Sequence, residues 1–417
     1  MSLPERETLS RRGYLRSLVA VGGVAGLSAC LEELGEPDVP SGDPDERPTR
    51  QHAWNTALRS DEDGNLLLPE HHVLVPLRTT APPDEAAREQ VERAFRSLER
   101  AYAFDHDGLL FTVGYSPTYF EDTDSSPIPR HEALTALESP EFDTFDALLH
   151  LASDHPSAVI EAEEALFGEV AEPNGVAVEA TLEGVFERAA PRRTGFVGAG
   201  LPAQHTDLDG VPGSVPEEAP FFMGFRSGFS ESQAPEDRVT IQEGPFAGGS
   251  TMHVESLDLQ LRTWFEQDSH YQRVAKTFSP EHADEELVGE IGEKLDTETG
   301  VAGEIAERTE ADARSRGMVG HAQKAARARD EDGTPPLLRR DFNTTDGDTP
   351  GMHFVSLQRT IDDFVRVREA MAGEDVAGEG VGERLNNGLL QYAFVRRRGN
   401  YLVPPRSKRA LPERTVK

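Results

Sequence analysis

Hydrophobic and polar residues alternate along this chain with two different periods, and the first half of the chain shows both. Strand-like runs of apolar and β-branched residues cover 71–78, 108–116 and 145–154. Apolar residues at helical spacing cover 84–102, and a proline in the first turn marks another helix at 155–170. The predicted order is therefore β-α-β, a loop, and β-α, which is the order of a ferredoxin-like sandwich.

The second half of the chain repeats this arrangement. Residues 248–264 alternate as a strand and run into a helix, and residues 351–371 predict another strand with an amphipathic helix. Between them lies a charged, helix-forming insertion, 279–350, and an insertion of this length is usually functional or disordered. The repeat predicts an α+β fold with duplicated ferredoxin-like halves, 66–215 and 216–406. Their antiparallel sheets with helices would pack together as in a dimeric α+β barrel.

The N-terminus has the pattern of an export signal. Arg11-Arg12 precede an apolar run, 18–27, that is shorter than a membrane span requires. A twin arginine is typical of Tat signals, and "LSAC", which ends at Cys30, is typical of a lipobox whose cysteine is lipidated. We predict a Tat and lipoprotein signal over 1–30, with a plain buried helix as the alternative, and an acidic Pro/Asp-rich tether over 31–65. The protein would then be exported, with Cys30 as its lipid anchor on the outer face of the cytoplasmic membrane.

The net charge of the chain disfavours some classes of binding partner. Acidic residues outnumber basic ones by 75 to 42, and the formal net charge is −33. The few lysines are Lys276, Lys294, Lys324, Lys408 and Lys417. An acidic, lysine-poor surface is typical of halophilic proteins, and it repels nucleic acid and anionic lipid. General disorder is the alternative, but it fits the linkers and not the periodic segments. The single cysteine excludes a disulfide framework and a cysteine-based zinc site.

Among the 13 histidines, one stands apart from the rest. His321 lies among small residues in the charged insertion, and Arg339 and Arg340 follow eighteen residues later, directly after two leucines. The chain has no HExxH motif and no Cys/His pair at zinc spacing. For an isolated histidine in a charged stretch, a surface position without a function is the ordinary alternative.

Five motifs place this histidine in a wider pattern. They are a Gly-x-x-x-Gly loop, "GFRSG" (224–228); the segment "GGSTMHVESLDLQLRTW" (248–264); His321 with "LRR" (338–340) eighteen residues later; "GMHFVSLQ" (351–358); and "GNYLVPP" (399–405). In this order and spacing the chain resembles the dye-decolourising (Dyp-type) peroxidases, a family of haem enzymes built from two ferredoxin-like halves. The resemblance covers about 71–406 and leaves a short tail, 407–417.

The resemblance implies a haem b cofactor bound by the insertion 279–350. His321 matches the proximal ligand of the haem iron, and neutral imidazole is a common axial ligand. Arg339 matches the distal arginine, which stabilises the negative charge that develops on the leaving oxygen when the peroxide bond breaks. Arg340, its neighbour, is implied to lie at the haem as well, where it could pair with a propionate.

The glycine loop departs from the family's pattern at one position. In the family it reads Gly-x-x-Asp-Gly, and here Ser227 stands in place of the aspartate. Gly224, Phe225 and Gly228 are implied to line the haem pocket, where the glycines let the backbone come close. A serine hydroxyl positions water or peroxide, but without activation it does not carry a proton as a carboxylate does. Asp341, two residues after the distal arginine, is the candidate that takes over this role.

A second departure concerns the acidic residue that many members of the family place beside the proximal histidine. The resemblance puts Thr360 at this position, with Asp362 and Asp363 just beyond it. An alignment shifted by two residues would restore an acidic partner for His321.

The resemblance implies an exported haem peroxidase that uses hydrogen peroxide to oxidise an unidentified reductant. The missing aspartate and the lipid anchor keep a second function open, which is a haem-binding protein with weak or no peroxidase activity for haem or iron acquisition or sensing. A third is an interaction domain that has lost haem. The oligomeric state stays open, a homo-oligomer included.

Overall fold

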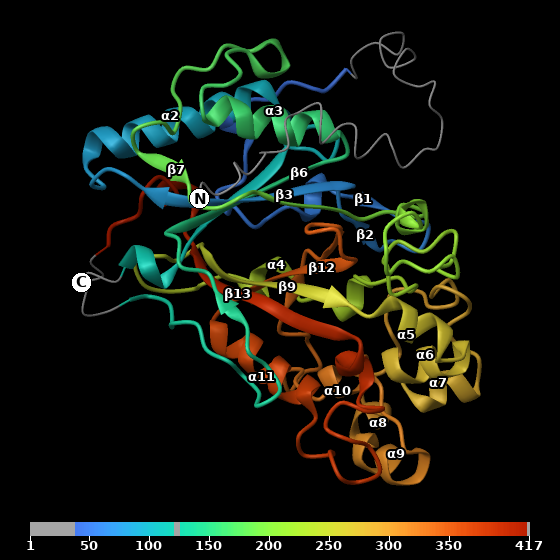
Figure 1. The fold of residues 1–417 in the computed structure, drawn as a ribbon. Coiled ribbons are helices and arrows are strands. Elements are labelled where there is room, and N and C mark those ends of the chain that lie inside the picture. The colour runs from blue at the N-terminus through green and yellow to red at the C-terminus, as the bar shows by residue number, and fades with distance from the viewer. Residues whose placement is uncertain (1–37, 121–125, 415–417) are drawn as a thin grey trace, which may run out of the picture.

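The computed structural model describes residues 38–120 and 126–414 (Figure 1). The predicted signal over 1–30, with the twin arginine and Cys30, lies outside these described residues. Within the described ranges, no helix combines the length and the apolar character that crossing a bilayer requires.

The N-terminal half is the ferredoxin-like unit that the apolar pattern predicts. Its elements are β3 (His71–Thr79), α2 (Glu85–Ala101), β4 (Leu110–Tyr115), β6 (Ala147–Ser153), α3 (Pro156–Leu166), β7 (Phe186–Arg188) and β8 (Arg193–Phe196). The strands pair antiparallel in the order β8-β3-β6-β4, and β7 pairs with the end of β3. Helices α2 and α3 cover one face of this sheet (Figure 1).

Helix α2 shows how the sequence produces this layer. Asp84 precedes the helix, and its carboxylate accepts a hydrogen bond from the backbone N–H of Ala87 at 2.9 Å, which satisfies an N-terminal donor. Val91, Phe95 and Leu98 recur at helical spacing and are buried against the sheet. The apolar face predicted for 84–102 is confirmed.

The C-terminal half repeats the same arrangement. Its elements are β9 (Ser250–Leu259), β10 (Leu338–Arg339), β11 (Phe342–Thr344), β12 (Gly351–Gln358), α11 (Ile361–Ala372) and β13 (Ala393–Val403). The strands lie antiparallel in the order β11-β12-β9-β13, and β10 also pairs with β12. In both halves the first strand lies between two later strands of the same half: β3 lies between β6 and β8, and β9 lies between β12 and β13. The predicted duplication is therefore confirmed.

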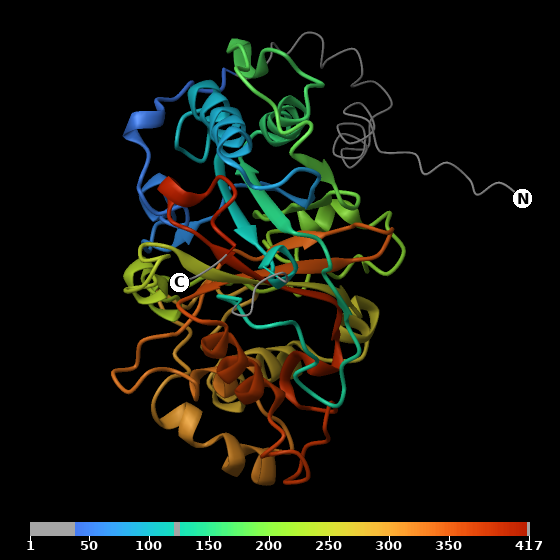
Figure 2. The same ribbon diagram turned by 90° about the vertical axis from the view of Figure 1, so that its left-hand side faces the viewer.

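The two sheets join at their edges into a closed barrel of strands. Asn343 in β11 pairs with Phe196 in β8, and Leu402 in β13 pairs with Tyr115 in β4. The inner faces of both sheets share one hydrophobic cluster, which includes Leu74 and Val254. Figure 2 shows the helices of the N-terminal half on one side of the strands and those of the C-terminal half on the other. The fold is thus the predicted α+β barrel of duplicated ferredoxin-like units.

Short helices cover the outer face of the C-terminal sheet together with α11 (Figure 1). They are α5 (Leu261–Glu266), α6 (His270–Thr277), α7 (Pro280–Asp284), α8 (Glu304–Glu307), α9 (Thr309–Arg316) and α10 (His321–Ala326), and α4 (Glu236–Val239) precedes β9. The predicted insertion 279–350 forms helices up to residue 326, as expected from its composition. They are short because glycines with positive φ interrupt them, such as Gly303 before α8 and Gly317 after α9.

The described part of the predicted tether, 38–65, packs on the N-terminal half instead of extending into solvent. Trp54 is 2% exposed, and β1 (Arg59–Ser60) pairs with β2 (Leu66–Leu67). Gln51 joins two distant strands, because its side-chain amide donates to the backbone oxygens of Val113 at 3.3 Å and Pro404 at 2.8 Å. Composition predicts a solvated linker here, but these bonds to distant backbone groups fix the segment.

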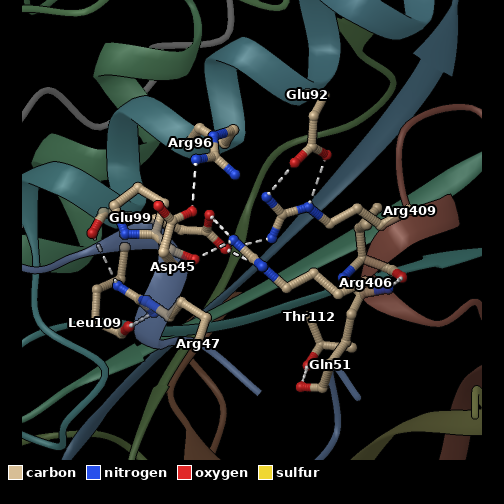
Figure 3. A network of polar contacts seen from close by, with 12 residues as sticks. Asp45, Arg47, Gln51, Glu92, Arg96, Glu99, Leu109, Thr112, Arg406 and Arg409 are labelled. Carbon is tan, nitrogen blue, oxygen red and sulfur yellow. Dashed lines mark hydrogen bonds and ion pairs between the residues drawn. The ribbon is translucent and has the colours of Figure 1, made fainter. Parts of the chain in front are cut away.

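Buried ion pairs join this segment, α2 and the C-terminal tail (Figure 3). Glu99 of α2 is 1% exposed and accepts hydrogen bonds from Arg406 at 2.9 and 2.6 Å and from Arg409 at 2.5 Å. Arg409 also donates to Glu92 at 3.0 Å, and Arg47 donates to the backbone oxygen of Leu109 at 3.2 Å. A short strand, β5 (Glu141–Phe142), adds to β13. The described part of the 407–417 tail is thus held by charge pairing rather than loose.

Several histidines are buried without a charged partner. His72 contacts His150 at 2.9 Å and stacks on Phe342 inside the barrel. Burial lowers the pKa of His52 and His71 to about 4 and that of His150 to about 3. These imidazoles are therefore neutral in the folded protein at neutral pH.

We expect the free energy of unfolding to fall steeply as the pH drops below about 6.5. In the unfolded chain His52, His71 and His150 take up protons near pH 6.5, whereas the folded state excludes them down to about pH 4, so stability rises with pH across this window. Each histidine contributes up to about 1.4 kcal/mol per pH unit to this slope. Asp341, whose pKa is raised to about 6, takes up its proton more readily in the folded state and so offsets the contribution of about one histidine. Urea unfolding from pH 5 to 7.5 measures the slope. His150→Gln should reduce it and the exposed His270→Gln should not, and equal stability at pH 5 and 7.5 would contradict the prediction.

Candidate active site

A cavity of about 270 Å³ lies between the C-terminal sheet and the short helices that cover it. The sheet contributes side chains from alternating positions, because residues i and i+2 of a strand face the same side. These are Glu255 and Leu257 of β9, Met352 and Phe354 of β12, and Ala393 and Val395 at β13. The opposite wall comes from α10 and α11 and from Thr299 and Val301 in the loop before α8. The exposed surface of the walls is mainly apolar, and several charged side chains border it.

His321 begins α10 and lines this cavity. Its side chain is partly exposed, whereas Nδ1 is buried without a hydrogen-bond partner among the described residues. Burial, with the charges of Lys324 and Arg339, lowers the pKa of His321 to about 3, so the ring is neutral at neutral pH. The neighbouring backbone is tightly packed, since a Cβ on Gly388 would lie 3.0 Å from the backbone nitrogen of His321. The structure therefore holds a neutral imidazole at a cavity wall with no internal partner.

Three of the predicted residues meet at another wall of the same cavity. The guanidinium of Arg339 donates to Ser227 Oγ at 3.1 Å, and its Nη1 lies 3.7 Å from Asp341 Oδ2. Asp341 Oδ1 accepts a hydrogen bond from the backbone N–H of Val355 at 3.2 Å. Burial raises the pKa of Asp341 to about 6, although Arg339 acts against this shift. A carboxyl group with this pKa takes up and returns a proton near neutral pH.

The "GFRSG" loop positions Ser227 by its backbone conformation. Gly224 and Gly228 have φ values of +89° and +84°, which side-chain-bearing residues rarely adopt. Phe225 between them lines the cavity and packs edge-on against Phe278. A Cβ on Gly224 would contact Phe265, and one on Gly228 would contact Gln233. Neither glycine lines this cavity. The loop needs its glycines for the turn that presents Ser227.

Arg340 is not brought to this cavity. Along the extended chain Arg339 and Asp341 point to one side, and Arg340 points to the other, toward Asn55 and Trp54. Its guanidinium donates to Asn55 Oδ1 at 2.9 Å and lies 5.6 Å from the ring of Trp54. The sequence expectation that both arginines lie at one cofactor therefore fails for Arg340, because adjacent residues of an extended segment face opposite sides.

The three residues considered as partners of His321 all lie away from its imidazole. Thr360 is the residue before α11, and Asp363 pairs with Arg238 at 3.0 Å and with Arg366 at 3.3 Å. Asp362 is exposed on the first turn of α11. None of the three lines the cavity. His321 therefore has no carboxylate partner among the described residues.

Sequence reasoning missed the buried lysine one helical turn after the histidine. Lys324 Nζ donates to the backbone oxygens of Met371 at 2.5 Å and Asn387 at 3.0 Å, and to Asn387 Oδ1 at 2.6 Å. Three carbonyl-type acceptors match the three N–H donors of an ammonium group. Burial lowers the pKa of Lys324 to about 7. A lysine three residues after the histidine, in a chain with few lysines, is the signal that could have indicated it.

A buried ion cluster borders the cavity at Glu255. Arg398 donates to Glu255 at 2.6 Å and to Glu138 at 2.8 Å, and Arg368 also pairs with Glu138. Burial opposes the charge of Glu255, but its contacts with His253 and the arginines lower its pKa to about 2. Two arginines thus pair with two glutamates, and the pair Arg398–Glu255 joins β13 to β9 beside the cavity.

Comparisons with known proteins agree with this architecture. The chain is similar to the encapsulated DyP-type peroxidase of Mycobacterium smegmatis, with 13% identity, a TM-score of 0.55, and 91% of this chain and 100% of that chain covered. A dye-decolorizing peroxidase from Bacteroides thetaiotaomicron has 15% identity and a TM-score of 0.52, with 86% and 100% covered. A DypB variant of Rhodococcus jostii in complex with haem has 13% identity and a TM-score of 0.54, with 87% and 98% covered.

At sequence identities of 13–15%, the similarity to these solved structures establishes the fold alone. No curated protein sequence matches the chain. A family model does match, however, and it spans residues 69–405, a range that includes the glycine loop, His321 and both arginines. The chain has the fold of DyP-type peroxidases and belongs to DUF7405, a family of unknown function.

Proposed function

We propose that this protein is a haem-dependent peroxidase of the dye-decolourising type, which uses hydrogen peroxide to oxidise a small reductant. One observation carries the proposal: the unpartnered imidazole of His321 and the group of Arg339, Ser227 and Asp341 line the same apolar cavity. This pairs a metal-binding nitrogen with a polar group able to handle peroxide, in a fold shared with haem peroxidases.

The residues of the cavity fit haem b. A buried imidazole nitrogen without a partner is costly unless a ligand compensates, and Nδ1 of His321 is buried without a hydrogen-bond partner among the described residues. The apolar walls suit a porphyrin, and Arg329 at the cavity offers a cation for a propionate. Bound haem would supply the redox-active iron that reduces peroxide and is then returned to its resting state by the reductant.

The chain's own residues supply charge and proton handling at the distal wall. Asp341, with a pKa raised to about 6, takes the proton from peroxide at Oδ2 and returns it to the leaving oxygen. Arg339 stabilises the negative charge on that oxygen through its Nη1. Ser227, held by Arg339, donates or accepts one hydrogen bond and orients the peroxide. Asp341 thus performs the role that the missing aspartate at position 227 would have.

The proposal includes export and a lipid anchor. It is supported by Arg11-Arg12, the apolar run 18–27 and the "LSAC" sequence ending at Cys30. The strongly acidic, lysine-poor composition supports a saline environment. The protein would act on the outer face of the cytoplasmic membrane, where Tat export delivers it folded and with its cofactor.

Haem titration of the apoprotein tests this function. Haemin should produce a Soret band with a saturation end point of one per chain, and His321→Ala should abolish the histidine-ligated spectrum because the axial nitrogen is removed. The exposed His270→Ala serves as the matched control and should leave the titration unchanged. An absent Soret band in the native protein, or an unchanged spectrum in His321→Ala, would contradict the proposal. Binding without peroxide turnover would favour a haem-binding protein instead.

A further inference from the structure

We propose that a second cavity binds a small organic carboxylate with an apolar body, through Arg340. This cavity measures about 630 Å³ and lies on the other side of the wall formed by Ser227, Arg339 and Asp341, which line both cavities. It is bordered by the loop after β2, the glycine loop and the segment that carries both arginines. The inference goes beyond the proposed function, because binding at this site does not require haem.

Arg340 is a buried cation without an ion pair. It is 3% exposed, its Nη2 donates to Asn55 Oδ1 at 2.9 Å, and its Nε is buried without a hydrogen-bond partner. No salt bridge joins it to a carboxylate of the described residues, although the charges of Glu236 and Asp341 act on it from a greater distance. Burial lowers the pKa of Arg340 only to about 10, so the guanidinium keeps its charge at neutral pH. A buried guanidinium without a direct ion pair is destabilising, and an anionic ligand would relieve this cost.

The other walls of the second cavity indicate the chemical character of the rest of the ligand. Most of the lining is apolar, and it includes Leu66, Leu68, Val197, Phe229, Ile291 and Leu338. Among the acidic residues at this cavity, Glu70 faces Arg59 at 3.9 Å and Asp61 accepts a hydrogen bond from Asn65 at 3.2 Å. Two guanidinium groups without an ion pair among the described residues therefore line this largely apolar cavity: Arg340, which is buried, and Arg226, which is half-buried. A planar carboxylate on a small aromatic or aliphatic body matches this arrangement, because guanidinium binds carboxylate in a bidentate fashion.

Isothermal titration of the haem-free protein with benzoate tests the proposal. Benzoate should bind one site per chain, and benzamide, which has the same shape but no charge, should bind at least about tenfold more weakly. Arg340→Gln should weaken benzoate binding by about 10- to 100-fold, because a charged hydrogen-bonding partner is lost. Arg59→Gln is the matched control, because Arg59 lines the same cavity but already pairs with Asp154 at 3.0 Å. It should change the affinity by less than about threefold.

Three results would overturn the proposal: no benzoate binding in the native protein, equal affinity in Arg340→Gln, or chloride that binds as tightly as benzoate. The comparison of benzoate with benzamide needs no variant, so the proposal stays testable if Arg340→Gln does not fold. Haemin titration of the same samples separates the two claims. An unchanged Soret titration in Arg340→Gln with lost benzoate binding supports a separate site, whereas lost haem binding in the native protein contradicts only the proposed function.

Discussion

Asp341→Asn is expected to lower the rate of reaction with hydrogen peroxide by about 10²–10⁴-fold, which is the usual contribution of a positioned acid–base group. Asparagine keeps the size of the side chain and the oxygen that accepts the Val355 N–H at 3.2 Å, but it carries no exchangeable carboxyl proton. The pKa of Asp341 is raised to about 6, so the native rate should fall as the pH drops through 6 and protonation removes the base. Stopped-flow spectroscopy at the Soret band from pH 4.5 to 8 measures both effects.

The neighbouring serine provides the matched comparison. Ser227→Ala removes only one hydrogen bond to Arg339, so its effect should stay below about tenfold. Ser227→Asp places a carboxylate at the position where the Dyp-type sequence pattern has an aspartate, and it should restore the rate of Asp341→Asn. In the native background Ser227→Asp should change the rate by less than about tenfold. A much larger gain there would mean that Asp341 does not act as the base, and that the native protein is a poor peroxidase.

Glu99→Gln is expected to reduce the free energy of unfolding by about 3 kcal/mol, because the buried Arg409 and the half-buried Arg406 lose their shared carboxylate. Glu99 accepts hydrogen bonds from both Arg406 and Arg409, and only Arg409 has another acidic partner, Glu92 (Figure 3). Chemical unfolding followed by circular dichroism measures the change. Glu89→Gln on the exposed face of the same helix is the control and should alter stability by less than about 0.5 kcal/mol.

The same substitution has a predictable pH dependence. Burial opposes the charge of Glu99, but the bonds from Arg406 and Arg409 overcome it and lower its pKa to about 2. A lowered pKa means that the stabilisation is fully present above the ordinary pKa of glutamate, near 4.3, and is lost as the pH falls toward 2. The difference between the native protein and Glu99→Gln should therefore shrink from pH 6 to pH 3. A difference that grows on acidification would contradict this assignment.

Prediction from the sequence worked where the pattern repeats over many residues. The spacing of Val91, Phe95 and Leu98 indicates the buried face of α2, and the run of apolar and β-branched residues in 71–78 indicates β3, which is buried on both faces. Both signals are local, since a helix buries its apolar face and a short apolar run forms a buried strand. The segment 38–65 gave the opposite result, because its position depends on single side chains, such as Gln51, that bind distant backbone groups.

The same distinction holds for the candidate site: motif spacing predicts some of its residues, and other contacts depend on the tertiary structure. Motif order placed His321, Arg339, Ser227 and Asp341 together, and the structure gathers them around one cavity. The side to which each arginine points was decided by a two-residue strand, too short to show a period in the sequence. The contact of Lys324 with Asn387 joins residues 63 positions apart, which no local pattern records.

By itself, the sequence determined the duplicated α+β fold and the residue types available for chemistry, because hydrophobic periodicity and motif spacing are properties of the chain. Only the tertiary structure decided that His321 lacks an acidic partner and that Asp341 is buried beside Arg339. It also decided that Arg340 lines a second cavity without a direct ion pair. Burial and charge pairing depend on which distant segments meet, and these two factors set the protonation state and the ligand preference of every group in the site.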